Sequence, residues 1–218
     1  MRPFNVEQIR KAMCLYAVTD SMWLGGRTLP EVVRESLEGG ATFIQIREKN
    51  LPYIEFVKLA REVKQVTDEF HVPYVVNDEV ELAKEIDADG VHIGQSDLTL
   101  VEARKLLGPD KIIGVSAQTV AQAIEAEKNG ADYLGVGSIF TTSTKLDADD
   151  VSLETLKEIC NAVSIPVVAI GGIQKDNVLQ LKGTHVDGVA VVSAIYAAPD
   201  IREAARELRK VADQLVGQ

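Results

Sequence analysis

Three polar side chains alternate along one short stretch of the sequence, at Gln45, Arg47 and Lys49. Residues two apart in an extended strand lie on the same face, so we expect these three to point together while the residues between them point away. An amide beside two cations suits an oxygen-rich anion, and arginine can bind such an anion through two parallel hydrogen bonds. A salt bridge from Arg47 to Glu48 or to a helix acid is the plainer alternative.

A second polar segment, Thr142-Ser143-Thr144-Lys145, follows a buried strand that we predict over residues 133–136. Gly135 and Gly137 remove side chains from one face of that strand, so another group can approach its backbone. Hydroxyls, amides and an ammonium beside such a gap indicate a phosphate pocket. A loop of this composition is more often simply exposed to solvent. The residues at the other strand ends must therefore distinguish a phosphate pocket from a solvated loop.

Two carboxylates, Asp78 and Asp97, follow the third and fourth predicted strands. Magnesium typically takes one or two carboxylates together with phosphate oxygens of a substrate. A paired general acid and base would use the same residue types. Each aspartate also stands shortly before a predicted helix, where it could serve as an N-cap. Metal binding and helix capping both stay open at this point.

The last two predicted strands also end in residues that suit phosphate, namely Gly171-Gly172 and Val192-Ser193. Many parallel barrels bind phosphate at these two loops and at the start of a short helix. Glycine lets backbone amides approach the oxygens closely, although a Gly-Gly turn without a ligand would look the same. His92 lies within a predicted strand, and we interpret it as a structural hydrogen-bonding residue rather than a base.

All of these polar groups stand at the C-terminal ends of apolar strands that alternate with helices. We predict strands at 14–18, 42–46, 74–76, 90–93, 111–115, 133–136, 165–170 and 188–192. Helices are expected at 29–38, 53–70, 80–86, 100–107, 119–129, 153–163, 176–181 and 201–215, after a short leader helix at 6–12. This order predicts a single (β/α)8 TIM barrel over residues 1–218, in which the C-terminal strand ends carry the site.

A weak internal repeat supports closure into a barrel rather than an open doubly wound sheet. Helix ends rich in glycine, alanine and aspartate recur before every second strand, at Gly40-Ala41, Ala88-Asp89-Gly90, Gly130-Ala131-Asp132 and Val186-Asp187-Gly188. The chain also lacks a break in composition that would mark a domain boundary.

The composition limits the kind of partner. A net charge of -10 over 218 residues argues against nucleic acid and against an anionic membrane surface. Cys14 and Cys160 form no CxxC motif, and the charged N-terminal segment lacks the apolar core of a signal peptide. We therefore expect a cytoplasmic protein with no membrane span. The oligomeric state stays open, a homo-oligomer included.

The motifs together resemble the thiamine-phosphate synthase family, from Leu15 to about Leu208. The segments that carry the resemblance are Leu15-Tyr16-Ala17-Val18-Thr19-Asp20, Gln45-Ile46-Arg47-Glu48-Lys49, Asn77-Asp78, Asp89-Gly90-Val91-His92-Ile93-Gly94-Gln95 with Asp97, Gly114-Val115-Ser116, Thr142-Ser143-Thr144-Lys145, Ala169-Ile170-Gly171-Gly172-Ile173 and Val191-Val192-Ser193-Ala194-Ile195. Their order and spacing are specific as a set, although each motif alone is not.

The resemblance implies a transferase of thiamine biosynthesis with two phosphorylated substrates. It would join an aminopyrimidine methyl diphosphate to a thiazole ethyl phosphate and release pyrophosphate. By position, the pyrimidine diphosphate would be bound by Gln45, Ile46, Arg47, Glu48, Lys49, Asn77, Ser116 and Lys145. The thiazole phosphate would be bound by Thr142, Ser143, Thr144, Gly172, Val192 and Ser193. Asp78 and Asp97 would hold Mg²⁺, and Arg47, Lys49, Ser116 and Lys145 would be the catalytic residues.

Three other functions stay open on the sequence alone. A related thiazole tautomerase would carry a histidine near the position of Ser116 and would lack a full diphosphate site. A non-catalytic barrel could bind a thiazole or thiamine phosphate as a sensor or carrier. A phosphosugar isomerase would need a glutamate or lysine base on an inward strand end, and we find no obvious candidate. The chain departs from the family at Gly137-Ser138 and Thr141, where the family usually has prolines that stiffen the loop.

Overall fold

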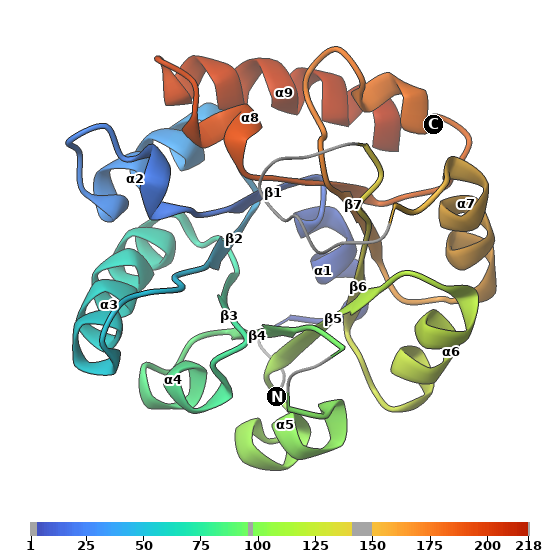
Figure 1. Ribbon diagram of the computed structural model, residues 1–218, viewed down its shortest axis with the longest axis horizontal. Helices are drawn as coiled ribbons and strands as arrows, with labels where there is room; N and C mark the ends of the chain where they lie inside the picture. Colours follow the sequence, from blue (N-terminus) through green and yellow to red (C-terminus); the bar gives the residue numbers. More distant parts are fainter. Residues whose placement is uncertain (1–3, 96–97, 141–149, 218) are drawn as a thin grey trace.

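Eight short parallel strands close into a barrel in chain order, each paired with the next and β8 paired with β1 (Figure 1). The computed structural model describes residues 4–95, 98–140 and 150–217. The strands are β1 (Leu15–Val18), β2 (Phe43–Ile46), β3 (Tyr74–Asn77), β4 (Gly90–Ile93), β5 (Ile112–Ala117), β6 (Tyr133–Val136), β7 (Val167–Ile170) and β8 (Gly188–Val191). They are short apolar runs buried on both faces, as expected of parallel strands covered by helices. The predicted TIM barrel is confirmed.

The helices form a ring outside the barrel, apart from α1. They are α1 (Val6–Ala12), α2 (Leu29–Gly39), α3 (Tyr53–Phe70), α4 (Val80–Glu85), α5 (Leu100–Leu107), α6 (Val120–Lys128), α7 (Leu153–Ala162), α8 (Ser193–Tyr196) and α9 (Ile201–Val216). The helix predicted over 176–181 is instead a 3-10 turn, η2 (Val178–Leu181), and the sequence did not predict α8 or the 3-10 turn η1 (Ser21–Trp23). Within the described ranges, no helix is long and apolar enough to span a membrane.

Helix α1 closes the N-terminal end of the barrel. Ile9 and Met13 are fully buried in one cluster with the inward side chains Tyr16, Val168 and Ala190. Figure 1 shows α1 across the centre of the ring rather than outside it. The leader helix is therefore the floor of the barrel, which leaves the C-terminal ends of the strands as its open side.

The internal repeat stabilises that same N-terminal end. Before each even strand, one side chain accepts a hydrogen bond from a backbone amide near the start of the preceding strand, while its own amide donates to the carbonyl of that residue. The four pairs are Thr42 with Leu15, Asp89 with Tyr74, Asp132 with Ile113 and Asp187 with Val167, with side-chain contacts of 2.9, 2.9, 2.9 and 2.8 Å. The repeat is thus structural, because each pair satisfies strand-end amides that would otherwise be buried without a partner.

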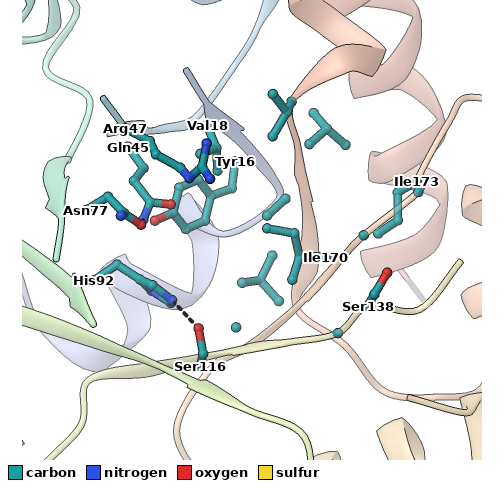
Figure 2. A pocket seen from close by; sticks show the side chains of 18 of the residues that line it. Tyr16, Val18, Gln45, Arg47, Asn77, His92, Ser116, Ser138, Ile170 and Ile173 are labelled. Carbon is teal, nitrogen blue, oxygen red and sulfur yellow. Dashed lines mark hydrogen bonds between the residues drawn. The ribbon is translucent and has the colours of Figure 1, made fainter. Parts of the chain in front are cut away.

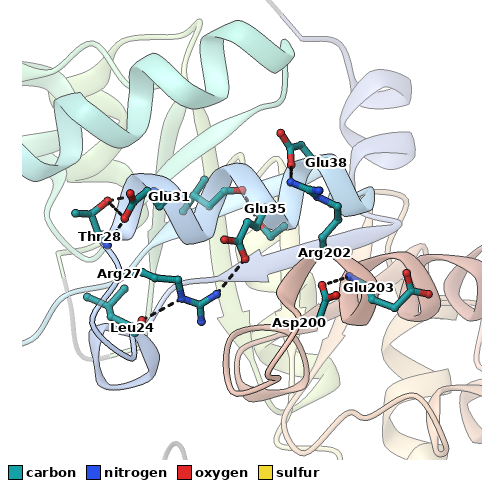
Figure 3. A network of polar contacts seen from close by, with 11 residues as sticks. Leu24, Arg27, Thr28, Glu31, Glu35, Glu38, Asp200, Arg202 and Glu203 are labelled. Atoms are coloured by element: carbon teal, nitrogen blue, oxygen red, sulfur yellow. Dashed lines mark hydrogen bonds and ion pairs between the residues drawn. The ribbon is translucent and has the colours of Figure 1, made fainter.

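Outside the seam between β1 and β8, helices α2 and α9 pack closely and are joined by an ion pair (Figure 3). Glu38 pairs with Arg202 across the two helices, and a side chain at Gly39 would overlap the Arg202 carbonyl oxygen at 2.4 Å. Thr28 caps α2 and Asp200 caps α9, since each accepts a hydrogen bond from an amide in the first turn. The first and last helices of the ring thereby hold the barrel closed.

Candidate functional site at the open end of the barrel

A cavity lies at the C-terminal ends of the strands, and side chains from every strand or the loop after it surround it (Figure 2). Its lining residues are Tyr16, Val18, Gln45, Arg47, Asn77, His92, Ser116, Gln118, Gly135, Gly137, Ser138, Val168, Ile170, Gly171, Gly172, Ile173, Ala190, Val191, Val192 and Ser193. Seven predicted site residues are among them: Gln45, Arg47, Asn77, Ser116, Gly172, Val192 and Ser193. The barrel thus brings together residues that are far apart in the chain.

One wall of the cavity is a chain of amides that leads to a carboxylate. Gln45 Nε2 donates to Asn77 Oδ1 at 3.0 Å, and Asn77 Nδ2 donates to Asp78 Oδ2 at 2.5 Å. Asp78 is exposed and has a positive φ of 62°, a conformation that asparagine and aspartate adopt more readily than most residues. The neighbouring strands β2 and β3 therefore hold an exposed carboxylate at the rim of the cavity.

Helix capping does not explain Asp78. The N-cap of α4 is Glu79, which makes no side-chain cap, so the capping alternative is wrong for Asp78. The N-cap of α5 is Thr99, which accepts a hydrogen bond from the amide of Glu102. Asp97 itself lies outside the described residues.

Arg47 pairs with an acid that the sequence pattern did not indicate. Its guanidinium lies 3.6 Å from Asp20 Oδ2, and among the described residues neither Glu48 nor a helix acid forms a salt bridge with it. Glu48 instead accepts a hydrogen bond from Ser21, and burial raises the pKa of its carboxyl. Asp20 also accepts from the amide of Met22 at 3.0 Å. The loop after β1 is thereby fixed against the segment after β2, with Arg47 at the cavity.

Two predicted residues of the same segment lie away from the cavity. Strand β2 ends at Ile46, so the same-face argument that grouped Lys49 with Gln45 fails, and Lys49 is exposed outside the lining. The Ile46 side chain is fully buried in the cluster beneath α3, with Phe56 and Ala60. At Ile46, only the backbone can face a ligand in the cavity.

The opposite wall is built from the loops after β7 and β8. Gly171 and Gly172 have positive φ angles of 101° and 63°, and a Cβ at Gly171 would lie 2.4 Å from Ser138 Oγ. The Asn177 side chain donates to the Gly172 carbonyl at 2.9 Å, which holds the turn. Ser193 begins helix α8, directly after Val192. Thr142, Ser143, Thr144 and Lys145, predicted for this wall and its neighbour, lie outside the described residues.

Gly135 in β6 and Gly137 just after it have different roles. A Cβ at Gly135 would face the His92 ring, 3.0 Å from its Cε1 atom, so this glycine widens the cavity as expected. A Cβ at Gly137 would lie 1.9 Å from the Ile170 carbonyl oxygen. Gly137 therefore admits the backbone of β7 and leaves no additional room for a ligand.

A hydrogen-bonded chain that the sequence did not reveal lies beneath Ser116. His92 Nε2 contacts Ser116 Oγ at 3.0 Å, and His92 Nδ1 contacts the Tyr133 hydroxyl at 3.0 Å. The Tyr133 hydroxyl in turn contacts that of Tyr16 at 2.8 Å. Burial raises the pKa of both tyrosines far above its ordinary value, so both hydroxyls stay protonated. Aromatic residues within strands are usually core residues, so Tyr16 and Tyr133 did not stand out in the sequence. The one sequence feature that pointed to this arrangement was Gly114, which lies opposite Tyr133.

The described residues could contribute to a magnesium site but do not enclose one. Among them, no group of three histidine, cysteine or acidic side chains is placed to hold a metal. Asp78 offers an exposed carboxylate beside Asn77 at the rim of the cavity. Mg²⁺ usually keeps several waters and takes one or two carboxylates plus substrate phosphates. The donor set therefore fits an ion that arrives with a phosphorylated substrate.

Comparison with known proteins places the chain among enzymes of one family. The profile of thiamine monophosphate synthase matches residues 15–195. The thiamine-phosphate synthase of Clostridium tetani is 50% identical over 194 residues, which cover 89% of this chain and 93% of that protein. The corresponding protein of Clostridium novyi is 50% identical over 198 residues, 90% of this chain and 97% of its own length. The structure of thiamine phosphate pyrophosphorylase from Pyrococcus furiosus superposes with a TM-score of 0.89 at 44% identity, over 96% of this chain and 100% of that one.

Proposed function

This chain belongs to the thiamine monophosphate synthase family, and from that premise we propose how its barrel carries out the reaction. The enzyme makes thiamine phosphate from a pyrimidine that carries a diphosphate and a thiazole that carries a phosphate, with release of pyrophosphate. The tautomerase, sensor and isomerase alternatives are set aside, because the relatives that match about nine-tenths of the chain are named as synthases.

The pyrimidine diphosphate binds at the wall formed by β2 to β5. The observation that carries this assignment is the convergence of Arg47, Asn77 and Ser116 on one cavity. A guanidinium, an amide and a hydroxyl suit the many oxygens of a diphosphate. Lys49, which is exposed outside the lining, and Lys145 would add positive charge in this proposal. Gln45 and Glu48 belong to the same segment, and Ile46 would contribute through its backbone.

Asp78 and Asp97 hold Mg²⁺ in this proposal, and Asn77 orients Asp78 through its 2.5 Å hydrogen bond. When bound, Mg²⁺ would neutralise charge on the departing pyrophosphate. Arg47 contributes to the same stabilisation, because its planar guanidinium can donate two parallel hydrogen bonds to phosphate oxygens.

The displacement proceeds by ionisation first. The amino group of the pyrimidine can stabilise a benzylic-type cation once pyrophosphate departs, so no protein nucleophile is required. The described lining includes no cysteine or lysine that would serve as one. Tyr16, Val18 and Val168 give the floor of the cavity an apolar surface, which excludes the water that would otherwise capture the cation. The thiazole nitrogen, held close by, then attacks with the advantage of proximity.

The thiazole phosphate binds at the wall formed after β6 to β8. Gly172 and Ser193 offer backbone amides and a hydroxyl at the cavity, next to Val192. Thr142, Ser143 and Thr144 supply further hydroxyls in this proposal. Two anion-binding walls facing one cavity match two substrates that each carry phosphate.

The test is a direct assay of product with the full chain. The purified protein is mixed with both phosphorylated precursors, with Mg²⁺ or with EDTA, and thiamine phosphate is measured after oxidation to its fluorescent thiochrome. Product that depends on both precursors and on Mg²⁺ is the expected result. A folded protein that gives no product beside an active control synthase would refute the function. Product that persists in EDTA would refute only the proposed requirement for Mg²⁺.

Two further proposals concern where and how the protein works. We place it in the cytoplasm, with support from two free and widely separated thiols. We also propose a homo-oligomer, for which light scattering coupled to size exclusion is the direct test. A mass of one chain, 23.7 kDa, would contradict it.

A further inference from the structure

Four side chains from four different strands form one hydrogen-bonded chain across the interior of the barrel. It starts at Tyr16 on β1, passes through Tyr133 on β6 and His92 on β4, and ends at Ser116 on β5. The three contacts measure 2.8, 3.0 and 3.0 Å. Figure 2 shows its last link, from the His92 ring to the Ser116 hydroxyl at the cavity. We call these residues the Tyr16–Ser116 chain.

Glycines on the neighbouring strands make room for this arrangement. Gly114 is paired with Tyr133 in the β5–β6 register, and a Cβ there would lie 2.0 Å from the Tyr133 ring. Gly135 stands opposite Ser116 in the same register, and a Cβ there would press on the His92 ring at 3.0 Å. The two rings therefore occupy space that other residue types would fill, which indicates a specific packing arrangement rather than a chance contact.

The direction of the hydrogen bonds follows from the buried end of the chain. Tyr16 is 1% exposed, and among the described residues its hydroxyl has Tyr133 as its one partner. A buried donor without an acceptor pays its full desolvation cost, so the Tyr16 hydroxyl donates to Tyr133. Tyr133 has a single hydroxyl hydrogen and gives it to His92 Nδ1.

The direction of the His92–Ser116 hydrogen bond and the orientation of the Ser116 hydroxyl hydrogen follow from this. A neutral imidazole whose Nδ1 accepts carries its hydrogen on Nε2, so His92 Nε2 donates to Ser116 Oγ. Because Ser116 Oγ accepts from His92, its own hydrogen points elsewhere. The Ser116 side chain lines the cavity, so that hydrogen is available to a ligand there.

We propose that Tyr16 and Tyr133 hold His92 as the Nε2–H tautomer, and that His92 thereby positions the Ser116 hydroxyl as a hydrogen-bond donor to the diphosphate-bearing substrate. His92 and Tyr133 are positioning residues, since they act through Ser116. The inference rests on the proposed binding role of Ser116. It adds three residues to the working site that no anion-binding motif would reveal, because none of the three has to touch the substrate.

The tautomer can be observed directly by ¹⁵N NMR of protein with labelled histidine rings. The chain has three histidines, so His71→Gln and His185→Gln variants leave assignment of His92 unambiguous. The expected spectrum shows a neutral His92 ring with the proton on Nε2 and an unprotonated Nδ1. Tyr133→Phe should remove that preference, because Nδ1 loses its donor. A native His92 with its proton on Nδ1 would overturn the proposal.

Kinetics test whether the chain acts on Ser116. Tyr133→Phe should lower kcat/KM for the pyrimidine diphosphate by about tenfold, but by less than twofold in a Ser116→Ala background. Tyr74→Phe is the matched control, because the Tyr74 hydroxyl is equally buried and donates to the Ala60 carbonyl on the helix side of the barrel. That control should leave kcat/KM unchanged, even if the melting temperature falls as it does for Tyr133→Phe.

The outcomes separate this inference from the proposed function. Equal losses from Tyr133→Phe in both backgrounds would mean a purely structural role and would overturn the inference while leaving the synthase assignment intact. No loss from Tyr133→Phe would do the same. If Ser116→Ala itself changes neither kcat nor KM, the binding role of Ser116 is wrong, and the inference falls with it.

Discussion

The guanidinium of Arg47 lies 3.6 Å from the carboxylate of Asp20, and the two side chains are only 16% and 19% exposed. This ion pair joins the loop after β1 to the end of β2 at the cavity. Because both charges are largely removed from water, the pair restricts the orientation of Arg47 more than a surface salt bridge would. It leaves a planar guanidinium fixed where a diphosphate is proposed to bind.

Arg47→Lys is therefore expected to lower kcat/KM for the pyrimidine diphosphate by about 10- to 100-fold, although the charge is retained. Lysine has no planar fork and cannot make two parallel hydrogen bonds to one phosphate group. Asp20→Asn should have a smaller effect of about threefold, because asparagine can still accept from the Met22 amide while the ion pair is lost. Steady-state kinetics on the two variants and the parent measure these losses. A larger loss of kcat/KM for Asp20→Asn than for Arg47→Lys would contradict the prediction.

Asp78→Asn should raise the Mg²⁺ concentration that gives half-maximal activity by at least about tenfold, with partial recovery at high Mg²⁺. Asn77→Ala should raise it by about tenfold as well, since Asn77 Nδ2 orients the Asp78 carboxylate and loss of such an outer partner typically weakens metal binding by 10–100-fold. Activity is titrated against Mg²⁺ for each variant. Unchanged midpoints for both would exclude Asp78 as a ligand.

Gly114→Ala should reduce the free energy of unfolding by more than about 2 kcal/mol, because the new methyl group would overlap the Tyr133 ring. Gly135→Ala should cost less, since its closest contact is 3.0 Å from a His92 atom that borders the cavity. Combining Gly114→Ala with Tyr133→Leu should restore part of the lost stability. Urea denaturation measures all three, and additive losses in the double variant would show that the two residues do not compete for space.

The Cys14 thiol should resist modification in the folded protein. Burial raises its pKa to about 11, in spite of the nearby Arg209 guanidinium, and its Sγ lies 3.4 Å from Asp213 Oδ1. At pH 8 only on the order of a thousandth of such a thiol is the reactive thiolate. In a Cys160→Ser background, a disulfide reagent should therefore label Cys14 in urea but not under native conditions. Rapid labelling of the folded variant would contradict the burial.

The sequence predicted the strands well because parallel strands covered on both faces are continuous apolar runs with little ambiguity. It also located the site, since the polar residues at the strand ends face one cavity once the barrel closes. Gln45 was predicted from its place on a strand, Asn77 and Ser116 were predicted from the resemblance to the family, and all three line that cavity. These predictions depend on the local sequence pattern and on the rule that the site of such a barrel lies at the C-terminal ends of its strands.

What the sequence could not give depends on contacts between distant strands. The partner of Arg47 is Asp20, a residue from another loop, and the Tyr16–Ser116 chain joins four strands. The Lys49 argument failed for a local reason, because β2 stops at Ile46 and the alternation of faces ends with it. Side-chain pairing becomes predictable only when the register of neighbouring strands is known.

Helix α1 closes the N-terminal end of the barrel. Ile9 and Met13 seal the floor beneath Tyr16 and Val168, so in the described part of the chain the cavity opens at the opposite end, and both substrates and both products pass through that opening. Occupancy of that opening by one substrate or product therefore limits the access of the others.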